Sequence, residues 1–147
     1  MKALANFLFE TGMLKRTPRS GLQFLGSGSE TVAEHSFRVI MITYTLAHMD
    51  SAVDENRALK MALVHDILES RTGDLNYVNK KYLTVNEEKA VQDVTEPLPF
   101  GPEVKELLRE FRAKETPESL IVNDADQLEL ILMLKEYGDL GNKYSKD

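Results

Sequence analysis

The sequence predicts an all-α protein of about five to six helices. Apolar residues recur at spacings of three and four along most of the chain, and no segment shows the sustained apolar-polar alternation of a half-buried strand. Candidate caps, glycines and prolines divide the pattern into separate segments. The 147 residues contain no internal repeat or linker-like run, so we expect a single domain covering residues 1–147.

Caps and helix breakers predict the boundaries in the first half of the chain. Thr31 and Glu34 fit a capping box, in which each side chain bonds the other residue's backbone N–H. Asp54 is a plausible cap for the following helix, and Gly73 is placed to end it. The expected elements are a helix over residues 2–12, an ordered loop over 15–29, a helix over 31–49 and a helix over 54–71.

The second half of the chain is divided in the same way. A second capping-box pattern runs from Thr84 to Glu87, and three prolines between residues 97 and 102 interrupt the chain. Thr116 can cap the last helix, with Pro117 in its first turn. The expected elements are a helix that begins at Thr84, a short helix over residues 103–113 and a final helix over 117–137.

Composition limits the function classes. No apolar run reaches the roughly 20 residues that cross a bilayer, and the N-terminal apolar stretch is interrupted by Asn6 and Glu10, so we expect no membrane span or leader. The net charge of -6 argues against broad attraction to nucleic acid. Without cysteine, a metal site would need imidazole and carboxylate ligands, and we expect a cytoplasmic protein.

Two of the three histidines fall in apolar helical segments. His35 lies on the same helical stripe as Val39 and Ile42, so it should face the core. A buried histidine can also be satisfied by a backbone carbonyl or a hydroxyl, and His35 alone decides nothing. The third histidine, His48, lies near a helix end and is expected at the surface.

The pair His65-Asp66 is more informative, because it follows the apolar run Ala58–Val64. An unpaired buried carboxylate costs several kcal/mol, so Asp66 needs a cation or strong donors. A divalent metal would satisfy it, and the alternative is an ion pair with an arginine of the preceding loop. The predicted continuous helix places Glu69 one turn beyond His65, about 6 Å along the axis and on the same side.

The final helix carries two further acids in an apolar context, Asp124 and Asp126. Asp126 shares a face with Val122 and Met133, whereas Asp124 falls with apolar residues on another face that could also point inward. Periodicity does not choose between the two acids. Two histidines and two aspartates are the set that this chain can most readily assemble, and such ligands suit Mn, Co, Ni, Zn or Fe(II).

Taken together, these segments resemble the HD-domain metal-dependent phosphohydrolases, and most closely their 5'-deoxynucleotidase branch. The resemblance covers residues 14 to about 140. The segments that carry it are Leu14–Gly21 (Leu-Lys-Arg-x-Pro-Arg-x-Gly), Glu34–Ser36, Ala62–Glu69 (Ala-Leu-Val-His-Asp-x-x-Glu), Thr72–Asp74 and Val122–Glu129 (Val-x-x-x-Asp-Gln-x-Glu).

The resemblance implies an HD-domain helical bundle with a single metal site in its core. One divalent metal ion (Mn, Co, Zn, Ni, Fe or Mg) would be held by His35, His65, Asp66 and Asp126, so the resemblance selects Asp126 over Asp124. It also implies hydrolysis of (deoxy)ribonucleoside 5'-monophosphates to nucleoside and phosphate. Relatives often carry a Trp near the substrate loop, but this chain has none, and base and sugar selectivity are therefore not predicted.

The same resemblance implies roles around the metal. Glu69 maps to the catalytic acid and Arg16 to the substrate-binding arginine. Apart from the resemblance, Arg19 could supply a further phosphate contact, although basic residues in loops are usually only solvated. An ion pair with Arg71 or Lys60 is the structural alternative for Glu69. Asp74 either hydrogen-bonds the sugar and supports catalysis or only caps a turn.

Two rival functions remain open. One is an HD-domain hydrolase of a triphosphate, a cyclic dinucleotide or an alarmone, although two-metal versions need more histidines than this chain has. The other is a non-catalytic metal- or nucleotide-binding module, in which a cation only stabilises the fold. The expected partner is a small-molecule nucleotide, with no nucleic acid or membrane. A homodimer is a possible assembly, because relatives often dimerise and the apolar segment Leu128–Leu134 could form an interface.

Overall fold

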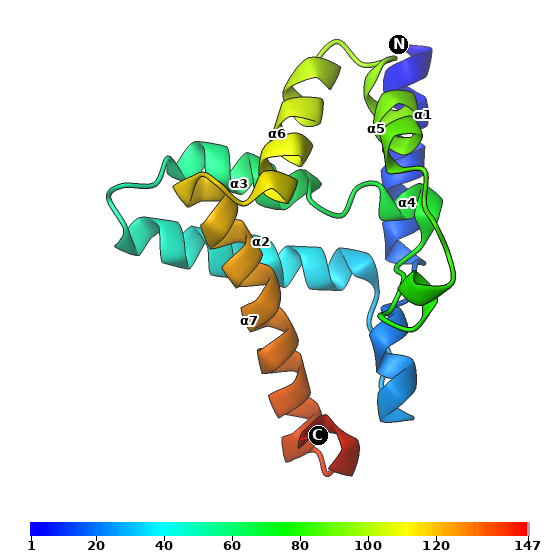
Figure 1. The fold of residues 1–147 in the computed structure, drawn as a ribbon, viewed down its shortest axis with the longest axis vertical. Coiled ribbons are helices and arrows are strands. Elements are labelled where there is room, and N and C mark those ends of the chain that lie inside the picture. The colour runs from blue at the N-terminus through cyan, green and yellow to red at the C-terminus, as the bar shows by residue number, and fades with distance from the viewer. Residues whose placement is uncertain (147) are drawn as a thin grey trace.

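Residues 1–146 are described by the computed structural model, and this range contains helices, turns and no strand (Figure 1). The all-α prediction is therefore confirmed. The α-helices are α1 (Lys2–Thr11), α2 (Val32–Met49), α3 (Glu55–Val64), α4 (Glu69–Thr72), α5 (Glu87–Thr95), α6 (Gly101–Ala113) and α7 (Pro117–Asp139). Short 3-10 helices connect several of them: η1 (Gly12–Lys15), η2 (Ser20–Leu25), η3 (Asn79–Lys81) and η4 (Lys143–Lys146).

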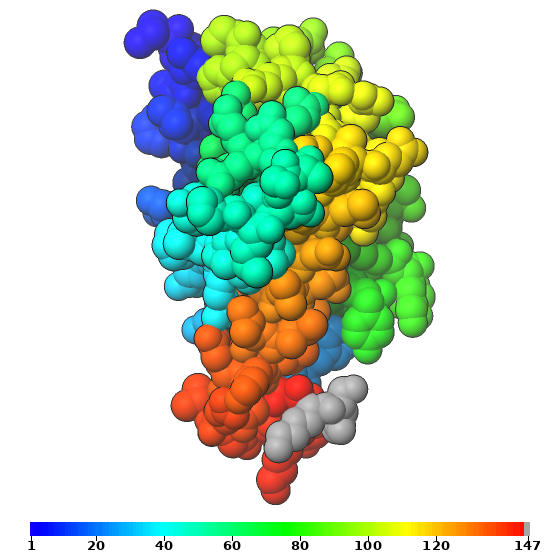
Figure 2. Space-filling view, turned by 90° about the vertical axis from the view of Figure 1, so that its left-hand side faces the viewer, coloured from blue at the N-terminus to red at the C-terminus, as the bar shows by residue number. Residues whose placement is uncertain are grey.

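The centre of the fold is the packing of α2, α3 and α7 against one another. In Figure 1, α2 and α3 lie side by side and α7 crosses them, while α1, α4 and α5 stand at one side. Figure 2 looks onto the turn between α2 and α3, with α7 beside it. Val39, Met61 and Val122, one from each central helix, are completely shielded from solvent. The apolar stripes identified in the sequence therefore form one shared core.

Most predicted helix ends agree with the structure, because their caps form. Thr31 and Glu34 make the expected capping box at α2, with the Glu34 carboxylate 2.7 Å from the Thr31 backbone nitrogen. Thr116 caps α7 as predicted. The prediction for α5 was wrong by two residues: Asn86, not Thr84, is the cap, since its side chain accepts from the backbone N–H of Lys89 at 3.0 Å.

The predicted continuous helix from 54 to 71 is wrong, because the chain turns between α3 and α4. The His65 ring donates a hydrogen bond from Nδ1 to the Ala62 carbonyl oxygen at 2.8 Å. From Ile67 onward the backbone bonds shorten to i→i−3 spacing, as in the bond from the Glu69 N–H to the Asp66 carbonyl at 3.0 Å. Glu69 therefore begins α4 and does not lie one regular turn beyond His65.

The ordered loop expected over residues 15–29 is present and contains η2. Its two ends are tied by an antiparallel bridge between Pro18 and Thr31. Its middle is tied to a distant segment, because the Ser20 N–H donates to the Asp74 carboxylate at 2.8 Å. Asp74 is thus neither exposed nor limited to capping its own turn. This loop is held against the end of α4 before any ligand binds.

No helix among the described residues combines the length and apolar character needed to cross a lipid bilayer.

Gly101 provides a test of how tightly α6 packs on the segment after α5. An added Cβ would lie 1.9 Å from the backbone oxygen of Thr95, so Gly101→Ala must push the two segments apart. We expect a loss of about 1–3 kcal/mol in the free energy of unfolding, the usual cost of overpacking. Urea denaturation followed by circular dichroism measures it. Gly12→Ala is the matched control, since nothing lies within 4 Å there and φ is -62°; equal stability of the two variants would contradict the prediction.

Candidate metal centre

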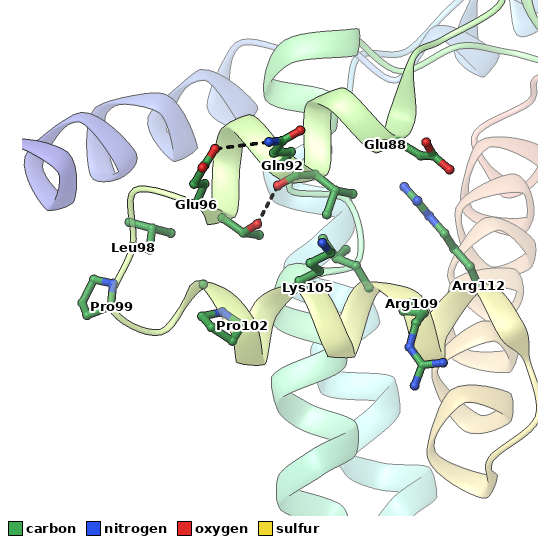
Figure 3. A pocket seen from close by; sticks show the side chains of 13 residues that line it. Glu88, Gln92, Glu96, Leu98, Pro99, Pro102, Lys105, Arg109 and Arg112 are labelled. Carbon is green, nitrogen blue, oxygen red and sulfur yellow. Dashed lines mark hydrogen bonds between the residues drawn. The ribbon is translucent and has the colours of Figure 1, made fainter.

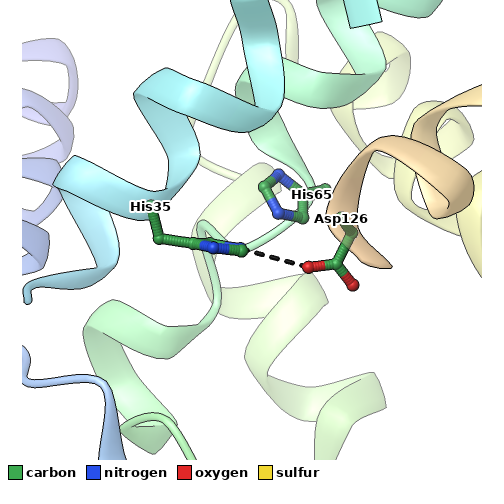
Figure 4. A group of neighbouring side chains, drawn as sticks. All are labelled: His35, His65 and Asp126. Atoms are coloured by element: carbon green, nitrogen blue, oxygen red, sulfur yellow. Dashed lines mark ion pairs between the residues drawn. The ribbon is translucent and has the colours of Figure 1, made fainter. Parts of the chain in front are cut away.

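Side chains from α2, the end of α3 and α7 meet at one point in the core (Figure 4). His35 Nε2 lies 3.2 Å from an Asp126 carboxylate oxygen, and the His35 and His65 ring centroids are 5.7 Å apart. One ligand atom from each of these three residues lies within 4.8 Å of the others. Residues separated by up to 91 positions are therefore brought within reach of a single ion.

Asp66 completes the group predicted from the sequence. Its Oδ2 lies 3.4 Å from His35 Nε2 and 3.2 Å from His65 Nε2. Arg19 also approaches Asp66, with Nη1 at 3.9 Å. An ion pair with an arginine was the alternative to a metal for Asp66. Arg19 makes only a long contact with this carboxylate, and the two imidazoles lie closer to it. Asp124, the other candidate of α7, is exposed.

The free ring nitrogens fit a cation. His35 Nδ1 contacts the Glu129 carboxylate at 2.6 Å and His65 Nδ1 donates to the Ala62 carbonyl at 2.8 Å, so the outer nitrogen of each ring is satisfied. Both Nε2 atoms are buried without a hydrogen-bond partner and face the carboxylates of Asp66 and Asp126. Two imidazole nitrogens and two carboxylates are donors that suit a divalent transition metal.

The imidazoles and carboxylates of the cluster shift one another's pKa values. Burial lowers the pKa of His35, but the neighbouring carboxylates of Asp126 and Glu129 outweigh it and raise that pKa to about 9. Burial likewise opposes a charged His65, yet the Asp66 carboxylate raises its pKa. The pKa of Asp66 and that of Asp126 are lowered despite burial, because the imidazoles face both acids. The cluster therefore requires positive charge.

Glu69 differs from the other acids. Burial first, and then the charges of Asp66 and Asp74, raise its pKa to about 8. Its Oε2 is buried without a hydrogen-bond partner. The ion-pair alternative is wrong, because Arg71 pairs with Glu10 and Lys60 pairs with Glu103 at 2.6 Å. Glu69 thus combines a raised pKa with an unoccupied oxygen, as expected of a group that transfers protons.

The two candidate arginines occupy different positions. Arg19 lies inside the site, with Nε 3.9 Å from Asp74 and Nη1 at the same distance from Asp66. Arg16 is exposed at the end of η1 and lines, with Arg19, a cavity of about 490 Å³ beside the start of α2. Leu22 is buried at 6% exposure and packs in a small cluster with Leu25 and with Met133 of α7.

A pocket of about 390 Å³ opens onto the cluster and is lined by His65, Asp66, Glu69 and Asp126. Lys80 also lines this pocket. Arg112 and Lys114, at the end of α6, complete it. Arg112 pairs with Glu87, which lines the same pocket, so Lys80 and Lys114 are the cations through which this pocket could hold an anionic ester.

A larger cavity, of about 1000 Å³, lies between α5 and α6 and is not part of this site (Figure 3). Its cations face neighbouring acids: Arg109 pairs with Glu106 at 2.6 Å and Arg112 with Glu87 at 3.2 Å. It contains no histidine and none of the clustered acids. We therefore place the chemistry at the smaller pocket.

Two residues beside the cluster received no firm role from the sequence. Glu129 is completely buried, and its carboxylate contacts His35 and Arg38. The available signal was its position three residues after Asp126, which places both on one side of α7. Arg38 also contacts Glu136, at 2.7 Å, so it pairs with acids and is not free to bind substrate.

Comparisons with known proteins identify the family of the chain. A family model described as HD domain matches residues 11–146. The mouse protein named 5'-deoxynucleotidase HDDC2 is 34% identical over 146 residues, covering 95% of this chain and 72% of its own length. The Schizosaccharomyces pombe protein named 5'-deoxynucleotidase hdd1 is 33% identical, covering 92% of this chain and 72% of its own length.

Solved structures extend the similarity to the fold. A conserved hypothetical protein from Pyrococcus furiosus superposes with a TM-score of 0.86 at 36% identity, covering 96% of this chain and 83% of that one. A predicted metal-dependent phosphohydrolase from Magnetospirillum magnetotacticum has a TM-score of 0.75 at 30% identity, covering 90% and 71%. The expected helical bundle is thus confirmed at the level of the whole chain.

The raised pKa of His35 predicts how metal-free stability depends on pH. Because the pKa rises from 6.5 to about 9 on folding, the stabilisation is complete below pH 6.5 and is lost as the pH rises through 9. The free energy of unfolding, measured by urea denaturation in chelator, should therefore fall between these two pH values. His35→Asn removes the titrating imidazole, so the free energy of unfolding should depend less steeply on pH. A pH dependence equal to that of wild type would contradict the raised pKa of His35.

Proposed function

The chain belongs to the HD domain family, and we propose that it is a metal-dependent 5'-deoxynucleotidase that hydrolyses nucleoside 5'-monophosphates to nucleoside and phosphate. The observation that carries this proposal is the meeting of His35, His65, Asp66 and Asp126 at one point, next to a pocket that the last three residues line together with Glu69. The names of the relatives supply the substrate class, and the pocket supplies a site for it.

We assign the four clustered residues as ligands of a single divalent metal, in agreement with the two partnerless Nε2 atoms that face Asp66 and Asp126. A bound divalent cation would act as a Lewis acid, which acidifies water and draws charge from a phosphate oxygen. The third histidine supports a single ion, because the side chain of His48 is 76% exposed and lies near Glu55.

Glu69 is assigned the proton transfer. Burial and the charges of Asp66 and Asp74 raise its pKa to about 8, toward the range in which a carboxyl can both release and take up a proton near neutral pH. A protonated carboxyl can donate to the 5'-oxygen as it leaves, and the carboxylate can then accept a proton from water. Its buried, partnerless oxygen is free for this exchange.

The arginine loop is assigned phosphate binding. Arg19 lies 3.9 Å from both Asp66 and Asp74, too far for a hydrogen bond to either, so its guanidinium can turn toward a phosphate. A forked donor suits two phosphate oxygens. Arg16 borders the adjacent cavity and would contact only a substrate that extends into this cavity. Asp74 holds the loop through Ser20, and the role proposed for it is a hydrogen bond to the sugar or support of the catalytic water.

Other expectations stay predictions. We propose one domain over the whole chain and a cytoplasmic location, and the identity of the metal is open. A homodimer also stays a prediction; α7 exposes Leu128, Leu130, Ile131 and Leu132, whose exposed fractions range from 37% to 58%.

Phosphate release from ribo- and deoxyribonucleoside 5'-monophosphates, with Mn, Co, Zn and Mg in turn, tests the proposed activity. We expect hydrolysis of 5'-monophosphates and little release from triphosphates, cyclic dinucleotides or alarmones. Asp126→Asn should abolish turnover and metal binding, whereas Asp124→Asn, two residues away but exposed, should change neither. Preference for a triphosphate would favour the rival hydrolase. Metal binding without hydrolysis of any ester would favour the non-catalytic module.

Glu69→Gln separates chemistry from metal binding. The amide keeps the shape but cannot transfer the proton, so kcat should fall by about 10²–10⁴-fold. Metal content, measured by atomic emission, should equal that of wild type, because Glu69 is outside the ligand set. Glu115→Gln, an exposed acid of the turn before α7, is the control. Turnover within twofold of wild type would remove Glu69 from the mechanism.

A further inference from the structure

Glu129 is a completely buried carboxylate that the proposed chemistry does not use. It lies on α7, one turn after Asp126, so a single helix carries both residues to the same side. Its two oxygens are divided between two partners. Oε2 lies 2.6 Å from His35 Nδ1, and Oε1 accepts from Arg38 Nε at 3.0 Å and Nη2 at 2.8 Å.

The contact with His35 decides which nitrogen of the ring is available inside the site. An ionised carboxylate only accepts hydrogen bonds, so Nδ1 must carry the proton. The lone pair of a neutral ring then lies on Nε2, which faces Asp66 at 3.4 Å and Asp126 at 3.2 Å. His65 shows the same arrangement with a backbone acceptor, the Ala62 carbonyl. For His35, the acceptor at Nδ1 is a side chain, the Glu129 carboxylate. The tautomer and orientation of this ring therefore depend on Glu129.

Arg38 fixes the carboxylate in turn. Its guanidinium bonds Glu129 through two nitrogens and Glu136 through the third, so it joins α2 to α7 at two places. The side chain of Glu129 is completely shielded, whereas that of Glu136 is 60% exposed. The rigid, buried part of this network is therefore the part that contacts His35.

We propose that Glu129, held by Arg38, is the positioning residue that fixes the tautomer and orientation of His35 for metal binding. This inference rests on the metal centre of the proposed function but not on the identity of its substrate. Acids that accept from metal-binding histidines contribute about 10–100-fold to metal affinity. The role belongs to Glu129 and not to Glu30, a nearby acid whose contact with Arg38 is 3.7 Å.

Glu129→Gln tests the proposal with almost no change in shape. Arg38 has only donors, so the amide oxygen must face it and the amide NH₂ must face His35. Nδ1 would then accept, and the proton would move to Nε2, the atom that faces the metal site. Zinc affinity, measured by competition with a chromophoric chelator, should weaken about 10–100-fold.

Glu136→Gln is the matched control, because it removes the same charge from the same helix and the same arginine but leaves His35 untouched. Its zinc affinity should stay within twofold of wild type. Zinc-loaded wild type should also show a slowly exchanging downfield ¹H resonance from His35 Nδ1, which Glu129→Gln should lose. Equal zinc affinity of Glu129→Gln and wild type, or equal losses in the two variants, would overturn the proposal.

Glu129→Asp keeps the test decisive should Glu129→Gln not fold. The shorter carboxylate can still accept from Nδ1 but cannot reach both partners at their present distances, so the resonance should persist while zinc affinity falls at least threefold. Unchanged affinity would overturn the positioning role. Zinc binding without hydrolysis of nucleotides would refute only the proposed substrate, whereas wild-type protein that binds no divalent cation would refute the metal centre and this inference together.

Discussion

The fold is organised around the burial of acids and imidazoles at one point between three helices. His35 and Glu129 are completely shielded, and the side chain of Asp66 is only 17% exposed. Each ionised group that leaves water loses several kcal/mol of hydration, so the cluster must contain compensating positive charge. Without a metal, protonated imidazoles supply it, which explains why the pKa of His35 and that of His65 are raised although burial alone lowers them. A divalent cation satisfies the same acids with both rings neutral.

The interruption between α3 and α4 solves a geometric problem that this cluster creates. Consecutive residues of a regular α-helix project about 100° apart, so His65 and Asp66 could not both face the same ion from a continuous helix. Ending α3 at Val64 and tightening the next turn brings the Asp66 carboxylate 3.2 Å from the His65 ring. The hydrogen bond from His65 Nδ1 to the Ala62 carbonyl thus helps to end the helix. The same bond leaves the Nε2 of His65 facing the site.

The sequence predicted features that depend on local chemistry. The capping box at Thr31 and the burial of His35 follow from spacing and were found as expected. The end of α3 was missed because nothing in the Ala58–Val64 run breaks a helix; the break depends on a side-chain hydrogen bond that spacing does not show. Asp124 and Asp126 could not be separated by periodicity, because both are flanked by apolar residues and only the packing of α7 on α2 chooses between them. The contact between Glu129 and His35 joins residues 94 positions apart and was likewise invisible.

The two halves of the site differ in how they are built, and this difference bears on selectivity. The clustered histidines and acids and Glu129 belong to α2, the end of α3, the turn after it and α7, and the packing of these helices forms the core. Changing these residues would therefore disturb the fold as well as the site. Arg16 and Arg19 instead belong to the loop over residues 15–29, which hydrogen bonds such as that from Ser20 to Asp74 hold in place. Substitutions in a loop of this kind exchange side chains without exposing the core. The substrate side of the site can therefore vary without loss of the core, whereas His35, His65 and Asp126 are held together by the packing of the central helices.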